Sequence, residues 1–154
     1  MDVITTVRRA NGGDLGLLLP LCAEHAAFER LPCAATARGD ALAAALDGTR
    51  PRLHAWLALA ETEAVGYASA TLDFSTFDAA PFLYLDCLYV REGRRGEGIG
   101  LRLWQAACDF GMRAGCAAMQ WQTPAWNEDA ARFYRRLGAV EHGKRRYVLD
   151  FAAR

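Results

Sequence analysis

The sequence predicts an α/β protein built on a central mixed, mostly antiparallel sheet with helices on both faces. Its 154 residues are 53% apolar and 23% charged, which is the usage of an ordinary globular domain with a sizeable core. The middle of the chain reads as consecutive strands joined by short turns, and this favours antiparallel pairing. In the second half strands alternate with helices, which favours adding strands to the same sheet through crossovers.

The N-terminal part predicts one strand followed by two helices. Ile4–Arg8 reads as a short strand, and Asn11–Asp14 as a turn that ends in a helix-capping residue. An apolar pattern predicts a helix over Leu15–Arg30, in which Pro20 is expected to produce a kink or to mark a helix start. The alanine- and leucine-rich stretch Arg38–Leu46 predicts the second helix.

Three strands are expected in the middle of the chain. Leu53–Ala60 and Ala64–Phe74 are apolar runs separated by three polar residues, and this pattern predicts an antiparallel hairpin. Phe82–Val90 is rich in β-branched and aromatic residues and predicts a third, long strand.

The last third alternates between helix and strand signals. Gly98–Ala114 predicts a helix that a glycine ends, and Cys116–Thr123 predicts a strand. Asn127 is expected to cap a helix that runs through Leu137. Val140 and Tyr147–Phe151 predict a closing pair of strands.

Composition bounds the class of protein and its partners. The net charge is zero, with 18 basic and 18 acidic side chains, so there is no global electrostatic footprint for nucleic acid. No apolar run reaches the roughly 18 residues that a membrane span needs. The five cysteines are odd in number and form no C-x-x-C pair, which disfavours a metal site and favours a reducing compartment. A single cytoplasmic domain, residues 1–154, is expected, without metal, membrane or nucleic-acid partners.

Four glycines lie between the third predicted strand and the following helix: Gly93, Gly96, Gly98 and Gly100. Glycine lets the backbone approach a ligand closely, and the first turn of a helix offers unpaired N–H groups and a positive dipole end. Together with the neighbouring arginines, this predicts a phosphate site, and the alternative is a tight turn without a ligand.

Two common phosphate motifs do not fit this glycine loop. No lysine followed by serine or threonine comes after the last glycine, so the P-loop pattern is excluded. The last position of a dinucleotide fingerprint would be Leu101 or Leu103, which excludes that pattern too. The pattern that fits is R-x-x-G-x-G, formed by Arg95, Gly98 and Gly100, and it resembles the acetyl-CoA pyrophosphate loop of the GNAT acetyltransferase superfamily.

Two further segments carry the same resemblance. Trp126–Ala139 is similar to the superfamily's N-x-x-A-x-x-F-Y-x-x-x-G-A signature, and Tyr84–Val90 is similar to its acetyl-CoA-binding strand. The resemblance extends from about Leu53 to Phe151 and more loosely over the N-terminal helices. It implies the GNAT-like acyl-CoA N-acyltransferase fold, with acetyl-CoA as co-substrate.

The resemblance also implies roles for individual residues in holding acetyl-CoA. Backbone groups of Leu88 and Val90 would hold the acetyl carbonyl and the pantetheine arm, while Tyr89 points to the opposite face of the strand. Asn127 would contact the pantetheine or simply cap its helix. The implied cofactor site consists of Leu88, Tyr89, Val90, Arg95, Gly96, Glu97, Gly98, Ile99, Gly100, Leu101, Asn127 and Tyr134.

The implied chemistry is direct attack of an amine on the thioester. Tyr134 would be the general acid for the departing thiolate, whereas the alternative is that it only packs its helix. The candidates for accepting the amine proton are Asp86, Glu29, Glu24 and His25. Asp86 is the first choice, although pairing with an arginine explains it equally well. His25 is expected at a helix surface.

Within the superfamily, the chain most resembles the spermidine/spermine and thialysine N-acetyltransferases. Phe28–Glu29 looks like that group's aromatic–Glu pair, and the implied amine site consists of Phe28, Glu29, Phe77, Asp86 and Trp121. The chain departs from the group at Cys87, where a second acid is usual, and at Ser75 and Phe77, where an acid and a tryptophan are usual. Fewer acids attract a polycation less strongly, so a smaller amine or an amino acid is expected at least as readily as a polyamine.

The expected function is therefore N-acetylation of a small-molecule primary amine by a homodimeric enzyme. Acetylation of a protein or peptide on the same scaffold is the first alternative. A non-catalytic acyl-CoA-binding module is the second, and Tyr134 argues against it because binding alone requires no acid at that position.

Overall fold

The computed structural model describes residues 3–153, which divide into two compact units: Met1–Gln122 and Thr123–Arg154. The first unit contains one five-stranded sheet and three α-helices, and the second contains one α-helix. No helix among the described residues is both long and apolar enough to cross a membrane.

The sheet has the strand order β1-β2-β3-β4-β5. The first four strands pair antiparallel with their neighbours, and only β5 runs parallel to β4. The predicted mixed, mostly antiparallel sheet is thus confirmed. The strands are β1 (Thr5–Arg9), β2 (His54–Ala60), β3 (Glu63–Ser75), β4 (Ala80–Val90) and β5 (Met119–Gln120).

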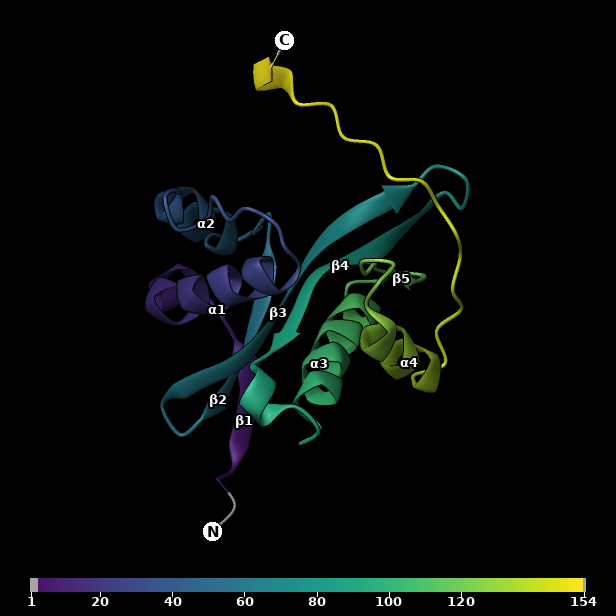
Figure 1. Ribbon diagram of the computed structural model, residues 1–154. Coiled ribbons are helices and arrows are strands. Elements are labelled where there is room, and N and C mark those ends of the chain that lie inside the picture. The colour runs from purple at the N-terminus through teal and green to yellow at the C-terminus, as the bar shows by residue number, and fades with distance from the viewer. Residues whose placement is uncertain (1–2, 154) are drawn as a thin grey trace. The chain divides into compact units, whose positions relative to one another are not determined.

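Helices cover both faces of the sheet, as predicted (Figure 1). On one face lie α1 (Leu15–Phe28) and α2 (Gly39–Leu46), and on the other lies α3 (Ile99–Arg113). Leu21 and Leu57 are fully buried between α1 and the sheet. Leu83 and Leu103 are fully buried between the sheet and α3, so two separate apolar layers hold the unit together.

The first helix and the last strand of this unit differ in extent from their predictions. Helix α1 continues through Pro20 and ends at Phe28, and the chain turns at Arg30, which has a φ of 61°. The predicted strand Cys116–Thr123 shortens to Met119–Gln120, which pair with Leu83 and Tyr84 of β4. Apolar alternation identifies strand-forming residues, but a strand also needs a partner for its backbone groups.

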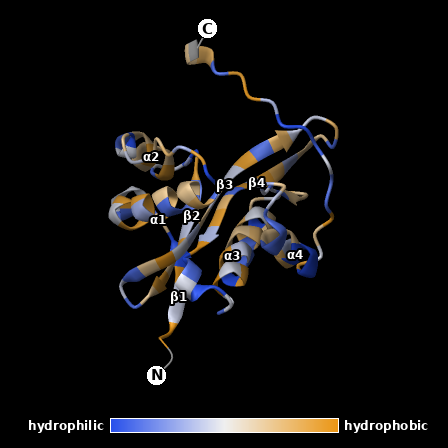
Figure 2. Ribbon diagram, in the orientation of Figure 1, coloured by the Kyte–Doolittle hydropathy of each residue, from blue (hydrophilic) through white to orange (hydrophobic). Residues whose placement is uncertain are grey.

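The second unit contains α4 (Glu128–Arg136), which Asn127 caps by accepting a hydrogen bond from the Ala130 amide at 3.2 Å. The prediction of closing strands at Val140 and Tyr147–Phe151 is wrong. Residues 139–150 have no regular structure, and Phe151–Ala153 forms a 3₁₀ turn. Figure 2 shows a hydrophilic run between apolar ends in this segment, and Val140 and Tyr147 are 78% and 84% exposed. Without a paired neighbour, the apolar pattern alone does not produce a strand.

A bulge in β4 decides which side chains face which helix. Ser69 pairs with Cys87 and Ala70 pairs with Leu85, so Asp86 is the extra residue. Because side chains alternate along a strand, one extra residue changes the side of the sheet on which each later side chain lies. Leu83 and Leu85 precede the bulge on the α3 side, and after the bulge that side is taken by Leu88 and Val90, while Cys87 and Tyr89 face α1.

Gly66 of β3 pairs with Val90 of β4 at a place that leaves no room for a side chain. A Cβ atom added there would lie 2.8 Å from the Tyr89 carbonyl oxygen and 3.2 Å from the Leu103 side chain. We therefore expect Gly66→Ala to lower the free energy of unfolding by about 1–3 kcal/mol, the usual cost of overpacking. Gly16 in α1 is the control, because nothing lies within 4 Å of its added Cβ and alanine favours helix. Gly16→Ala should raise stability by up to about 1 kcal/mol, and urea denaturation of both variants checks the opposite signs.

Candidate functional site

The glycine loop forms an open cradle at the beginning of α3. Gly96 and Gly98 have φ values of 83° and 77°, a backbone region that glycine adopts without strain. The first backbone hydrogen bond of the helix joins the Arg102 amide to the Gly98 carbonyl at 3.2 Å. The amides that come before Arg102 in the first turn therefore have no partner within the helix. Added Cβ atoms at Gly96 and Gly98 would meet nothing within 4 Å. This loop fits a phosphate ligand, because backbone donors and the positive helix end coincide there.

The two arginines of the loop have different partners. Arg94 forms an ion pair with Glu97 at 2.9 Å, which lowers the pKa of that carboxyl and neutralises its charge beside the cradle. Arg95 donates from Nε to the Val90 carbonyl oxygen at 3.0 Å, and its guanidinium lies 4.8 Å from the centre of the Phe28 ring. Arg95 therefore ties the loop to the end of β4 and to the end of α1.

The C-terminal half of β4 has an open edge. Among the described residues, β5 pairs with β4 only at Leu83 and Tyr84, whereas β3 follows the other edge to Val90. The Arg91 amide donates a hydrogen bond to the Val65 carbonyl of β3, whereas the Val90 carbonyl accepts one from the Arg95 side chain. Backbone groups on this edge, beyond Tyr84, can hold an extended ligand in the manner of an added strand.

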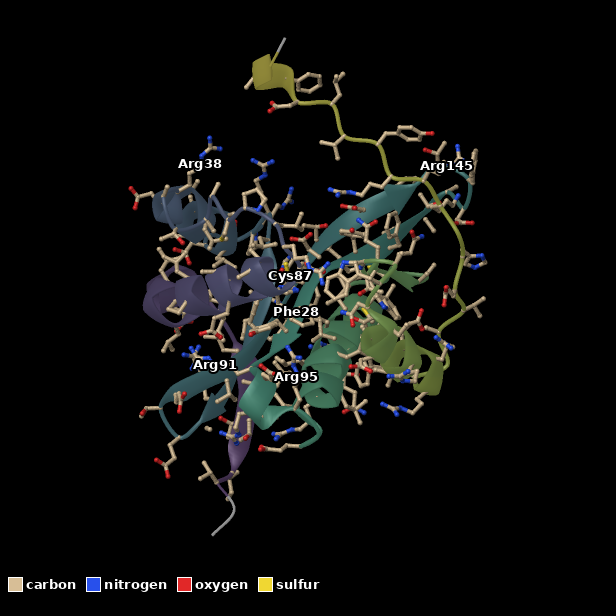
Figure 3. The ribbon with its side chains drawn as sticks, in the orientation of Figure 1. Phe28, Arg38, Cys87, Arg91, Arg95 and Arg145 are labelled. Carbon is tan, nitrogen blue, oxygen red and sulfur yellow. The ribbon has the colours of Figure 1, made fainter. Side chains whose placement is uncertain are left out.

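Two carboxylates lie near each other on the α1 side of β4. Glu29 follows the last residue of α1, and Asp86 is the bulged residue of β4. Burial and the negative charge of Asp86 raise the pKa of the Glu29 carboxyl. In Figure 3 the labelled Phe28, Cys87 and Arg95 lie between α1 and α3. The site can bind a cation and can also accept a proton.

His25 is buried between α1 and the sheet, so the expectation of a surface histidine is wrong. It is 9% exposed, and its Nδ1 lies 2.8 Å from the Tyr67 hydroxyl. Its ring stacks on Tyr89 with centroids 5.1 Å apart. The spacing of His25 four residues after Leu21 and seven after Leu18 places all three on one helix face, and this signal could have identified it.

The remaining predicted residues take other positions. Glu24 forms an ion pair with Arg91 at 2.9 Å, which is a structural contact. Phe77 lies at the turn of the β3–β4 hairpin and is fully exposed. Trp121 follows β5 and packs edge-on against Trp104, with centroids 6.3 Å apart. Asn127 and Tyr134 belong to the second unit, in which Tyr134 lies on α4 beside Phe133.

Burial and the positive charge of Arg95 lower the pKa of His25 to about 4, from 6.5. Above pH 6.5 the ring is neutral in both the folded and the unfolded chain, so it adds no pH dependence. Between pH 6.5 and 4 only the unfolded chain binds the proton, so stability falls as the pH falls. We expect His25→Gln to remove about 2 kcal/mol of the decline between pH 7 and 5. Urea denaturation at both pH values checks this, and equal declines would contradict it.

No three histidine, cysteine, aspartate or glutamate side chains within residues 3–153 are grouped so as to hold a metal ion. The donors at the site are instead backbone amides, carbonyls, carboxylates and one guanidinium, as described above. This set suits an acyl carrier that ends in phosphate groups, because amides bind the phosphates and an open strand edge binds the arm.

Comparisons with known proteins agree with this geometry. The thialysine N-epsilon-acetyltransferase of Bos taurus is 30% identical over 143 residues, which cover 88% of this chain and 84% of the relative. The aminoglycoside N-acetyltransferase AAC(6')-Iy, solved in complex with CoA, has a TM-score of 0.80 at 22% identity, covering 98% of this chain and 97% of that one. An aminoglycoside acetyltransferase from an uncultured soil metagenomic sample has a TM-score of 0.78 at 21% identity, covering 96% and 97%.

The family match spans the parts of the chain that build the cradle, the open strand edge and α4. The acetyltransferase (GNAT) family profile matches residues 22–139, which is most of the chain. The fold, with its mixed sheet and helices on both faces, is that of the solved relatives. The chain belongs to the acetyltransferase (GNAT) family and is an acetyl-CoA-dependent N-acetyltransferase.

Proposed function

We propose that this enzyme transfers the acetyl group of acetyl-CoA to a primary amine of a small molecule by direct attack. The observation that carries the proposal is the electrostatic interaction of two carboxylates, Glu29 and Asp86, of which Asp86 lies on the part of β4 that β5 leaves unpaired. Opposite charge stabilises an ammonium group there, and a neighbouring carboxylate can take its proton. Phe28 and Trp121 would line the amine site, and Phe77 would contact it from the hairpin turn.

The acetyl-CoA site would run from the strand edge to the cradle. Leu88 and Val90 would hold the acetyl and pantetheine groups through their backbone, with Tyr89 packed behind them. The amides of residues 95–101 would hold the pyrophosphate. Bound acetyl-CoA supplies an activated thioester, and the chain's own groups orient it, exclude water and move protons.

Tyr134 would protonate the thiolate that leaves. The family signature that contains it, and its position on a helix that Asn127 caps, support this assignment. A tyrosine hydroxyl within hydrogen-bond reach of the sulfur is a chemically adequate acid. In this proposal residues 1–154 act as one catalytic domain, and the family match across both units supports that reading.

The acceptor is proposed to be a compact amine or amino acid in preference to a long polyamine. Cys87 occupies the position next to Asp86, and its thiol lies 3.7 Å from the Asp86 carboxylate. Burial and the charge of Asp86 raise the pKa of Cys87 to about 12, so this side chain adds no negative charge at neutral pH. A smaller negative field favours an acceptor with one or two ammonium groups.

We further propose that the enzyme is a cytoplasmic homodimer. All five cysteines are unpaired, which is consistent with a reducing compartment. Light scattering of the purified protein measures the oligomeric state directly.

An acetyl-CoA consumption screen tests the proposed function. The panel contains thialysine, lysine, spermidine, aminoglycosides and a set of peptides. Turnover of single amino acids or compact amines above that of spermidine is expected. Turnover of peptides alone would favour protein acetylation instead, and tight binding of acetyl-CoA without any turnover would favour a binding module.

A further inference from the structure

The backbone of the glycine loop makes few contacts of its own. Among the described residues, the amides of residues 96–101 have no hydrogen-bond partner, and added Cβ atoms at Gly93, Gly96 and Gly98 would meet nothing within 4 Å. A glycine-rich backbone without contacts has many accessible conformations, and a ligand that binds one of them must offset the loss of that freedom. The arrangement of the amides therefore depends on the residues that hold the segment before the loop.

Helix α1 contacts that segment at two points. Arg91, which directly follows β4, donates to the Glu24 carboxylate from Nε at 3.0 Å and from Nη2 at 2.9 Å. The Arg95 guanidinium lies 4.8 Å from the centre of the Phe28 ring. Glu24 and Phe28 are about one helical turn apart, on the same side of α1. Arg91, Arg95 and Phe28 are labelled in Figure 3.

The contact between Arg91 and Glu24 has the geometry of a strong ion pair. Two nitrogens of the planar guanidinium face the two oxygens of one carboxylate, which fixes the direction of the arginine as well as its position. Nη1 binds a second carboxylate, that of Glu63 at the start of β3, at 2.9 Å. The Glu63 side chain is 66% exposed and that of Glu24 is 39% exposed, so water screens the pair with Glu24 less.

The backbone of Arg91 connects this ion pair to the loop. Its amide donates to the Val65 carbonyl oxygen of β3 at 2.9 Å, and its carbonyl oxygen accepts from the Arg94 amide at 2.9 Å. The second bond closes the 3₁₀ turn Glu92–Arg94, and the loop follows this turn directly. A displacement of Arg91 therefore moves the turn and the amides that come after it.

We propose that Arg91 is a positioning residue for acetyl-CoA: its ion pair with Glu24 of α1 holds the glycine loop in the arrangement in which the amides bind the pyrophosphate. The Arg91 guanidinium is occupied by two carboxylates, so it acts through its backbone and not as a phosphate ligand. A loop that is held before the ligand arrives loses less entropy on binding, which raises the affinity. The inference rests on the proposed pyrophosphate site at residues 95–101.

Arg91→Met tests this role, because methionine keeps an unbranched apolar stem and lacks the guanidinium. The dissociation constant of CoA and the KM for acetyl-CoA should each rise about fivefold to tenfold, while kcat and the amine KM stay within about twofold of the wild type. Arg91→Lys keeps the charge but cannot bind both carboxylate oxygens in a fork, so its affinity should lie between the two. Isothermal titration with CoA and steady-state kinetics measure these constants.

The two carboxylates that bind Arg91 show whether α1 is the element that matters. Glu24→Gln should weaken CoA binding about threefold, and the double variant with Arg91→Met should bind CoA no more weakly than Arg91→Met alone, since both changes break one contact. Glu63→Gln removes the partner that lies outside α1 and should change the affinity less than about twofold. An equal loss in Glu63→Gln, or additive losses in the double variant, would contradict the role of the pair with Glu24.

Arg8 provides the matched control for stability. It also binds a carboxylate through two nitrogens, with Nη1 3.0 Å from Oδ2 and Nη2 2.7 Å from Oδ1 of Asp14, but it joins β1 to the turn before α1. Urea denaturation should show similar losses of stability in Arg8→Met and Arg91→Met, whereas only Arg91→Met should lose affinity for CoA. Wild-type affinity in Arg91→Met, or an equal loss in Arg8→Met, would overturn the proposal.

Nitrogen-15 relaxation of the protein without ligand measures the loop directly. The order parameters of the amides of residues 96–101 should fall in Arg91→Met and remain at wild-type values in Arg8→Met. Unchanged order parameters in Arg91→Met would refute the inference even if acetyl transfer is observed.

Binding of CoA in the absence of an amine separates this inference from the proposed function. If Gly98→Ala lowers the affinity for CoA and Arg91→Met does not, the inference fails while the proposed pyrophosphate site stands. If neither variant lowers it, the pyrophosphate site fails and the inference fails with it. The expected affinities without turnover of any amine would support the inference and refute the proposed transfer to a small amine.

Discussion

Tyr134→Phe should lower kcat by about 100-fold, the middle of the range for loss of a general acid. The phenol is proposed to protonate the leaving thiolate, and phenylalanine keeps the ring while removing that proton. The KM for acetyl-CoA should change little, since the ring remains in place on α4. Steady-state kinetics with the best amine from the screen measures both parameters.

Tyr147→Phe is the control for this substitution. Tyr147 belongs to the same unit as Tyr134 but is 84% exposed and lies outside α4. Its loss of a hydroxyl should leave kcat unchanged. Wild-type kcat in Tyr134→Phe would mean that water, or another group, protonates the thiolate.

Gly98→Ala should raise the KM for acetyl-CoA at least about tenfold, equivalent to 1.4 kcal/mol of binding. Gly98 directly precedes α3 and has a φ of 77°, and a side chain there strains the backbone by about 1–2 kcal/mol. The strained loop no longer aligns its amides, and the new methyl group enters open space that the pyrophosphate is proposed to use. Isothermal titration with CoA and steady-state kinetics measure the effect.

Gly115→Ala is the control that separates a loss of CoA binding from a loss of stability through backbone strain. Gly115 follows the other end of α3, has a φ of 81°, and its added Cβ likewise meets nothing within 4 Å. Both variants should lose similar stability, while only Gly98→Ala should lose affinity for CoA. Equal affinities of the two variants for CoA would contradict the proposal that this loop binds the pyrophosphate.

Local patterns were sufficient for the family and for most elements. The glycine spacing of the loop and the Asn127-to-Ala139 signature depend on short stretches of sequence, because one helix start or one capped helix uses neighbouring residues. The same reasoning failed for Tyr147–Phe151. Alternation there describes a strand face, but nothing local specifies which strand would pair with it.

His25 shows a different limit of sequence reasoning. A histidine on a helix is expected at the surface, although the spacing of His25 from Leu18 and Leu21 places it on the buried face. Its hydrogen-bond partner Tyr67 lies 42 residues further along the chain. Such a pair becomes visible only when helix and sheet are packed together.

The sequence by itself determined that this chain is a GNAT acetyltransferase with a glycine loop at a helix start, since both features depend on contiguous residues. Only the tertiary structure decided how Glu29, Asp86 and His25 meet. Helix packing brings the end of α1 onto β4, and the bulge at Asp86 exchanges the faces of the strand, so that Tyr89 turns towards His25. Both effects depend on contacts between distant segments and on a one-residue shift in register, which no local pattern encodes.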